Sequence, residues 1–246
     1  MSIPKGRYAE RKAAIKEIKE LVSKPDHLLI IHYSCESFYK KIDGSSPRIT
    51  SIAVRYFRDG QTKSFSIHQV AEEKHGKISK KIEKEYNALE KEMLKRFFNF
   101  LDAHREYHWI HWNMRDANYG FEAIEHRFRV LKGTPVILSH EKKHDLARLL
   151  VQKYSVGYIG HQRFEKLIEK NKISNKNFLT GKEESEAFES REYWKLHQST
   201  LRKVDSLHSI LGRTANDSLK HNARFFEMYG ASIQDIVEMI KAHWIM

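Results

Sequence analysis

The 246-residue sequence has one cysteine, Cys35, and few residues that break regular structure, with four prolines and 11 glycines. A single cysteine excludes an intramolecular disulfide framework and a structural zinc site built on cysteines. No apolar run approaches the roughly 18 to 20 residues that a membrane-spanning helix needs. The basic start of the chain leads into a charged segment, which is atypical of a secretory signal. We therefore expect a cytoplasmic protein without a membrane partner.

What the sequence has in excess is positive charge. Lys and Arg number 44 against 32 Asp and Glu, which gives a net charge of +12. Hydrophobic residues make up 40% of the chain, enough to form a sizeable core and to exclude intrinsic disorder. A field of this sign attracts polyanions, of which nucleic acid is the commonest, although the same charge can serve solubility alone.

The hydrophobic pattern predicts an α/β fold. A charged helix is expected over residues 8–23, followed by a central strand at 27–33. Alternating residues at 49–57 and 62–67, joined by Asp59-Gly60, predict a hairpin. We interpret the charged residues from 72 to 81 as a linker that leads to a long helix with apolar residues at 3.6-residue spacing from Ile82.

The second half of the sequence is mainly helical in pattern. A short strand is expected at 108–112 and a helix at 121–131. Further helices are predicted at 144–154, 161–170, 193–211, 217–229 and 233–244, and the polar stretch 171–192 is interpreted as an irregular loop. This order predicts three parts: an N-terminal helix (1–25), an α/β domain (26–211) and a C-terminal helical extension (212–246).

One string matches a zinc-hydrolase motif. His140-Glu141-Lys142-Lys143-His144 has the form H-E-x-x-H, which on a helix places two imidazoles on one face beside a glutamate base. Two lysines lie inside the string, and Asp145 is expected to cap a helix from Leu146, so His140 would lie in a loop. Glu165 and Glu169 are the candidate third ligands. A zinc-dependent hydrolase therefore stays an alternative function.

A second set of residues begins at the end of the first strand. Ser34 and Glu36 are two positions apart, so on a strand they project to the same face. The later segments of interest are His111-Trp112-Asn113-Met114-Arg115-Asp116, Asn118, Asp145-Leu146-Ala147-Arg148-Leu149-Leu150, and the helix around Lys203 and Asp205.

From residue 26 to 211, this order of elements and motifs resembles the DEDD superfamily of 3′–5′ exonucleases. The resemblance implies a ribonuclease H-like mixed sheet flanked by helices. It also implies metal-dependent hydrolysis of phosphodiester bonds, with Mg²⁺ or Mn²⁺ as the cofactor. The catalytic candidates that it indicates are Glu36, Asp116, Asn118 and Asp205, of which Glu36, Asp116 and Asp205 are the candidate metal ligands.

The acidic set of that superfamily is incomplete in this sequence. Ser34 stands where the first acid is expected, Asn118 is nearest to the second aspartate, and Lys203 falls at the last acid. Two divalent ions repel each other and need several carboxylates to offset their charge. If Glu36, Asp116 and Asp205 converge, they can hold one ion through oxygen ligands.

An eroded nuclease site can still bind a strand without cutting it. We therefore expect a partner among DNA or RNA, with single strands favoured over duplexes. The cleft beyond Glu36 and Asn113 is the expected binding site, and its candidate contacts are Ser34, Trp112, Asn113, Arg115 and Lys203. A non-catalytic scaffold that binds a protein partner is the remaining alternative.

Overall fold

The structure is a computed structural model, and it describes residues 6–37, 46–76, 82–115 and 118–230. These residues form two compact units. The α/β unit contains residues 26–145 and 175–208, and the helical unit contains the described residues of 1–25, 146–174 and 209–246. The three-part division expected from the sequence stays a prediction.

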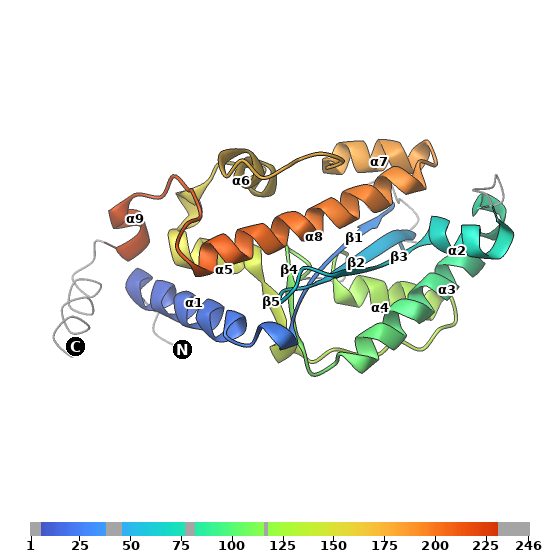
Figure 1. The fold of residues 1–246 in the computed structure, drawn as a ribbon, viewed down its shortest axis with the longest axis horizontal. Helices are drawn as coiled ribbons and strands as arrows, with labels where there is room; N and C mark the ends of the chain where they lie inside the picture. Colours follow the sequence, from blue (N-terminus) through green and yellow to red (C-terminus); the bar gives the residue numbers. More distant parts are fainter. Residues whose placement is uncertain (1–5, 38–45, 77–81, 116–117, 231–246) are drawn as a thin grey trace. The chain divides into compact units, whose positions relative to one another are not determined.

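The α/β unit is built on a five-stranded mixed sheet with strand order 3-2-1-4-5 (Figure 1). Its strands are β1 (Leu28–Cys35), β2 (Ile49–Tyr56), β3 (Thr62–Ser66), β4 (His108–His111) and β5 (Lys143–Asp145). The pairs β1–β2 and β2–β3 are antiparallel, whereas β4 is parallel to both β1 and β5. The mixed α/β class, the central first strand and the hairpin predicted from the sequence are confirmed.

The two faces of β1 differ in character because alternate residues of a strand point to opposite sides. Leu29, Ile31 and Tyr33 belong to the main hydrophobic core. That core also includes residues of α3 (Ile82–Ala103) and α4 (Phe121–Val130). The buried stripe of α3 follows the predicted 3.6-residue spacing, and burial of this apolar surface provides the main stabilisation of the unit.

The opposite face of β1 becomes polar toward its C-terminal end, where it presents His32 and Ser34. The first part of α8 (Tyr193–Ala215) covers this side, on the other side of the sheet from α3 and α4 (Figure 1). The hydroxyl oxygens of Ser51 and Thr200 lie 2.7 Å apart, and His208 Nε2 lies 3.0 Å from the carbonyl oxygen of Phe57. These two contacts show that α8 follows the direction of β2.

Two helices of the α/β unit were not expected. Residues Ile67–His75 form α2, although the sequence interpretation ended a strand at 67 and began a linker at 72. Helix α7 (Gly181–Glu189) lies inside the stretch interpreted as an irregular loop. It begins at a capping box in which Thr180 and Glu183 satisfy each other's backbone N–H groups, so local hydrogen bonding establishes a helix that has few apolar residues.

Two predicted helices are shorter in the structure than expected, and a third lies outside the described residues. Residues 144 and 145 belong to β5, so α5 begins at Leu146. Residues 217–224 are not helical, and α9 contains only Phe225–Tyr229. The predicted helix at 233–244 lies outside the described residues.

The helical unit contains α1 (Arg7–Val22), α5 (Leu146–Tyr154), α6 (Arg163–Lys170), α9 and the end of α8. Ala14, Ile18 and Leu21 form the buried stripe of α1. Helix α1 packs against α5 and α9, and Arg11 Nη1 donates a 2.7 Å hydrogen bond to the carbonyl of Lys153. In the described part of the chain, no helix has the length and apolar character needed to cross a membrane.

Candidate functional site

The candidate site lies where the parallel strands of the sheet end. In sheets with parallel strands, ligands commonly bind beyond the carboxyl ends of those strands. Strands β1, β4 and β5 run in the same direction and end at Cys35, His111 and Asp145. The segments predicted to carry chemistry, Ser34 to Ser37 and His111 to Arg115, therefore start at one edge of the sheet.

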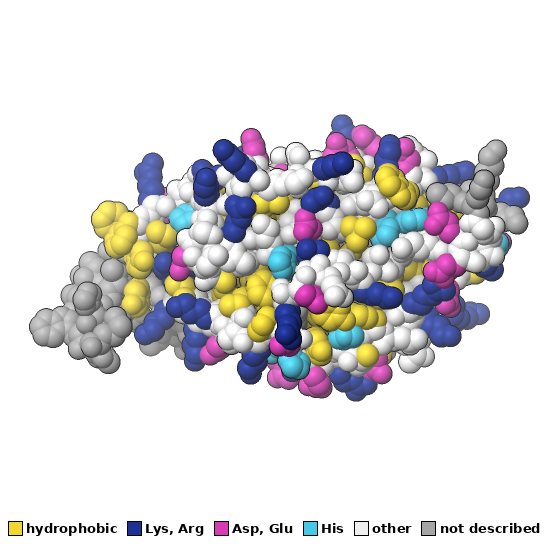
Figure 2. Space-filling view, viewed as in Figure 1, with side chains coloured by type: hydrophobic (Ala, Val, Ile, Leu, Met, Phe, Trp, Pro, Cys, Tyr) yellow, Lys and Arg dark blue, Asp and Glu magenta, His cyan; other side chains and the backbone are white. Residues whose placement is uncertain are grey.

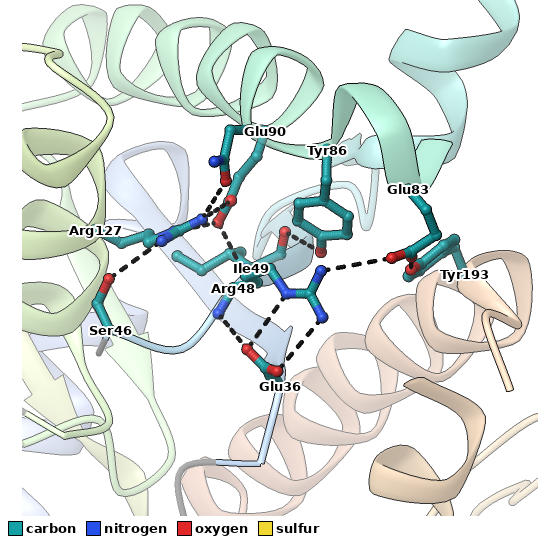
Figure 3. Close-up of polar contacts among 10 residues, drawn as sticks. Glu36, Ser46, Arg48, Ile49, Glu83, Tyr86, Glu90, Arg127 and Tyr193 are labelled. Carbon is teal, nitrogen blue, oxygen red and sulfur yellow. Dashed lines mark hydrogen bonds and ion pairs between the residues drawn. The ribbon is translucent and has the colours of Figure 1, made fainter. Parts of the chain in front are cut away.

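Glu36 follows β1 directly and is bound to Arg48, the residue before β2. Its carboxylate lies 3.4 Å from both Arg48 Nε and Nη2, and it accepts a 3.3 Å hydrogen bond from the Arg48 backbone N–H (Figure 3). The backbone N–H of Glu36 in turn donates to the Arg48 carbonyl at 2.8 Å. Both side chains are partly buried, so the pair is better shielded from solvent than a surface ion pair.

The Arg48 guanidinium is held by more than Glu36. Its carbon lies 4.6 Å from the ring centre of Tyr86 and 4.8 Å from that of Phe188, both within cation–π distance. Arg48 Nη1 also lies 3.6 Å from Glu83, whose carboxylate accepts a hydrogen bond from the Tyr193 hydroxyl (Figure 3). Helices α3, α7 and α8 therefore all help to fix the arginine that binds Glu36.

A pocket of about 300 Å³ opens beside this pair. The residues that line it are Glu36, Ser37, Arg48, Glu83, Ser185, Phe188, Glu189 and Arg191. Three glutamates and two arginines give this lining a formal charge of −1. Such a lining does not attract phosphate groups in the way that a basic groove does.

A second, deeper ion pair supports the start of β2. Glu90 is fully buried and accepts hydrogen bonds from Arg127 at 2.9 and 2.5 Å and from the backbone N–H of Ile49 at 2.6 Å (Figure 3). Burial raises the pKa of Glu90, and Arg127 opposes that shift. Arg127 also donates hydrogen bonds to Asn87 and Ser46. This network holds in place the residues next to Arg48.

Ser34, on β1, and Lys203, on α8, are both buried. Ser34 is 1% exposed, and its hydroxyl has no hydrogen-bond partner among the described residues. Lys203 is 6% exposed, and its ammonium lies 2.8 Å from the Glu184 carboxylate. Because Ser51 pairs with Ser34 and also contacts Thr200, Lys203 lies one helical turn beyond the level of Ser34.

The charges of this ion pair affect the titratable groups of β1. Burial lowers the pKa of His32 well below its usual value, and the positive charge of Lys203 lowers it further. Burial, followed by the charges of Glu184 and Glu36, raises the pKa of the Cys35 thiol to about 12. His32 is thus neutral and Cys35 a thiol at neutral pH, so neither is prepared for acid–base or nucleophilic chemistry.

The turn after β4 is held by Asp145. The carboxylate of Asp145 accepts a 3.1 Å hydrogen bond from the Asn113 N–H and lies 2.8 Å from Arg115 Nε. Arg115 also donates to the side-chain oxygen of Asn113 at 2.7 Å. Asn113 has φ +55°, a left-handed conformation that asparagine tolerates better than most residues. Asn113 and Arg115, both predicted contacts for nucleic acid, therefore form one exposed cluster with a buried aspartate.

The structure does not bring Glu36 and Asp205 together. Asp205 binds Arg55 at 3.2 Å and Arg202 at 2.6 Å. Arg55 is near the end of β2, whereas Arg48, the partner of Glu36, precedes that strand. Seven residues of extended chain separate the two arginine Cα atoms by about 20 Å.

The remaining predicted site residues differ in their exposure. Trp112 is only 8% exposed, and Asn118 is exposed. Asp116 lies outside the described residues.

No group of three metal-ligating side chains is present in the described ranges. The H-E-x-x-H string does not form a helix: His140–Lys142 is a 3₁₀ turn and His144 lies on β5. His144 Nε2 lies 2.9 Å from His108 Nδ1 on the neighbouring strand. The two histidines of the string therefore lack the one-turn spacing on a helix face that this motif requires.

Sequence reasoning missed the partners of the predicted residues. Arg48 could have been found, because the residue after one strand of an antiparallel pair lies opposite the residue that precedes the next strand. Glu184 and Phe188 gave no such signal, since they belong to the helix that was interpreted as a loop.

The chain was compared with protein-family models, with curated proteins and with solved structures, and none of these comparisons found a match.

Proposed function

We propose that this protein binds single-stranded DNA or RNA without cutting it, and that its α/β unit is a ribonuclease H-like domain with an eroded nuclease site. The order of elements supports the fold assignment. Three antiparallel strands are followed by the short helix α2, the long helix α3 and a parallel strand that leads into a His-Trp-Asn segment. Apart from α2, this is the order that the resemblance to the exonuclease superfamily implies.

The absence of cleavage is inferred from one observation: the charged residues at or near the acid positions of the superfamily are each paired with an opposite charge. Lys203 occupies the position of the last acid and is paired with Glu184. Glu36 is bound by Arg48, and Asp205 by Arg55 and Arg202. A divalent ion would have to displace these cations, and the buried ammonium of Lys203 would repel it. Mg²⁺ or Mn²⁺ would therefore be required only if these pairs open to form a catalytic site with Glu36 and Asp116.

Binding and cleavage can be tested with one labelled oligonucleotide. We expect the wild type to bind it in the presence of a chelator at about 50 mM salt, and to lose affinity steeply as salt rises, because phosphate contacts release counterions. Addition of Mg²⁺ or Mn²⁺ should yield no shortened product. Absence of binding at low salt, or binding that salt does not affect, would contradict the proposal.

Two variants distinguish the catalytic alternatives. If Mg²⁺ or Mn²⁺ supports cleavage and Glu36→Gln abolishes it, the protein is an active metal-dependent nuclease and the non-catalytic proposal is wrong. If zinc co-purifies with the wild type and is lost only in His144→Ala, the zinc-hydrolase alternative gains support. The proposal requires that both variants bind the oligonucleotide as the wild type does and that neither cleaves it.

A further inference from the structure

The positive charge of the protein is concentrated in the helical unit. Residues 1–25, 146–174 and 209–246 contain 17 Lys and Arg and nine Asp and Glu, a net charge of +8. The α/β unit contains 27 Lys and Arg and 23 Asp and Glu, a net charge of +4, although it is the larger of the two. The candidate pocket of the α/β unit has an acidic excess. The helical unit therefore has the larger net positive charge with which to attract a polyanion, whereas the lining of the pocket has none.

Part of this charge forms a row on α1. Lys12, Lys16 and Lys19 are exposed and follow the four- and three-residue spacing that aligns side chains on one face of a helix. At about 100° per residue, they lie opposite the buried stripe of Ala14, Ile18 and Leu21, so the row faces away from the core of the unit. Lys16 has a weak contact of 3.7 Å with Glu20, in which both side chains are exposed. The row is therefore available to phosphate groups.

Exposed aromatic residues lie on α9, which packs against the start of α1. Phe225 and Phe226 are 53% and 71% exposed. Arg11 lies over the ring of Tyr229 at 4.7 Å, and Arg7 donates a 3.1 Å hydrogen bond to the carbonyl of Glu227. Figure 2 shows hydrophobic side chains at the surface over α9, with Lys and Arg side chains over α1 and α6. The aromatic residues therefore lie beside the helix that carries the lysine row.

We propose that the nucleic-acid-binding surface of this protein is the helical unit, where the lysine row of α1 contacts phosphates and Phe225 and Phe226 stack on unpaired bases. This inference rests on the proposed function and specifies its surface. A basic track combined with accessible aromatic rings is the usual arrangement for binding single strands, because every base has a face on which a ring can stack. A duplex or an anionic lipid surface would use the charge without requiring stacking.

The test compares two triple variants that remove equal charge from the two units. In the first, Lys12, Lys16 and Lys19 are replaced by glutamine. In the control, the exposed α3 residues Lys84, Lys91 and Lys95 are replaced in the same way. Each phosphate contact contributes about 0.7 to the slope of log K against log salt for a single strand. We expect the α1 variant to lower that slope by about 2 and the affinity at 0.1 M salt by roughly 100-fold, and the α3 variant to match the wild type.

A third variant tests stacking separately from charge. Phe226→Ala should lower affinity for a single-stranded oligonucleotide about 5- to 100-fold and leave the salt slope unchanged. Affinity for a duplex should change little.

The outcomes distinguish the two proposals. A wild type that does not bind the oligonucleotide contradicts the proposed function itself. If the wild type binds but the α3 variant loses as much affinity as the α1 variant, or the α1 variant loses none, only the proposed surface is wrong. Binding to anionic lipid vesicles in place of the oligonucleotide overturns both.

Discussion

The ammonium of Lys203 on α8 lies 2.8 Å from the carboxylate of Glu184 on α7, and both side chains are largely buried. Glu184 also accepts a 3.0 Å hydrogen bond from Ser199, so its carboxylate is bound by both the lysine and a hydroxyl group. Lys203 is the residue that we propose to stand at the last acid position of an eroded nuclease site, and its positive charge is compensated by this carboxylate.

Breaking this pair should destabilise the protein. Lys203→Met removes the positive charge that compensates the largely buried Glu184 carboxylate. We therefore expect a loss of about 3 kcal/mol in the free energy of unfolding. The measurement is urea unfolding at neutral pH. Lys195→Met is the matched control, because Lys195 and its partner Glu192 are about half exposed, and its effect should stay within roughly 1 kcal/mol. Equal losses in the two variants would show that the buried pair has no special role.

The buried pair of Glu90 and Arg127 should contribute more strongly still. Arg127→Met removes three hydrogen bonds to side chains of α3, and among the described residues it leaves the fully buried Glu90 with the Ile49 N–H as its hydrogen-bond donor. We expect a loss of about 3 to 5 kcal/mol in urea unfolding. The control is Arg129→Met on the same helix, whose exposed guanidinium makes a 3.7 Å contact with Glu125. If Arg127→Met unfolds at the same urea concentration as Arg129→Met, the network does not support β2 as we infer.

The elements that the sequence predicted well are those whose burial pattern is regular. Strand β1 is apolar on both faces through Ile31, which is typical of a strand inside a sheet. Helix α3 repeats buried residues at helical spacing over 22 residues. In both segments, burial and periodicity point to the same structure, so local sequence is sufficient.

The helices that the sequence did not predict, α2 and α7, lack a long periodic pattern of apolar residues. In α7, only Ala187 and Phe188 are buried, and the helix is defined at its start by hydrogen bonds between Thr180 and Glu183. In α2, Ile67, Val70 and Ala71 have helical spacing, but they follow a strand without an intervening loop. The ion pair of Lys203 with Glu184 joins two helices, and its partner is fixed by their tertiary packing.

The single cysteine offers a direct test of the environment at the end of β1. Because burial and the nearby glutamates raise the pKa of Cys35 to about 12, only a minute fraction of it is thiolate at pH 8. We expect a thiol reagent to modify the native protein at least about 100-fold more slowly than the urea-unfolded chain, in which the thiol has a pKa of about 8.5. Each molecule carries one thiol, so the observed rate belongs to Cys35 alone. Rapid modification of the native protein would show that this strand end is open to solvent and that Glu184 is not close to the thiol.

Two buried histidines should make the protein sensitive to acid. Burial, followed by the charges of His144 and Arg115, lowers the pKa of His111 to about 3, and burial together with His68 lowers that of His197 to about 4. In the unfolded chain both have pKa values near 6.5. As pH falls below 6.5, the unfolded state therefore binds protons that the folded state does not, and stability is lost progressively until the folded pKa values are reached.

The expected size of this effect follows from the linkage relation. Each histidine costs about 1.4 kcal/mol of stability per pH unit between roughly pH 6 and pH 4, so the two together remove about 4 kcal/mol between pH 7 and pH 5. His197→Gln should reduce the slope of stability against pH by about half of their joint contribution, because glutamine does not titrate. His126→Gln, at an exposed position of α4, should leave the slope unchanged. Urea unfolding at pH 7, 6 and 5 gives all three slopes, and a His197→Gln slope equal to that of the wild type would assign the acid sensitivity to other groups.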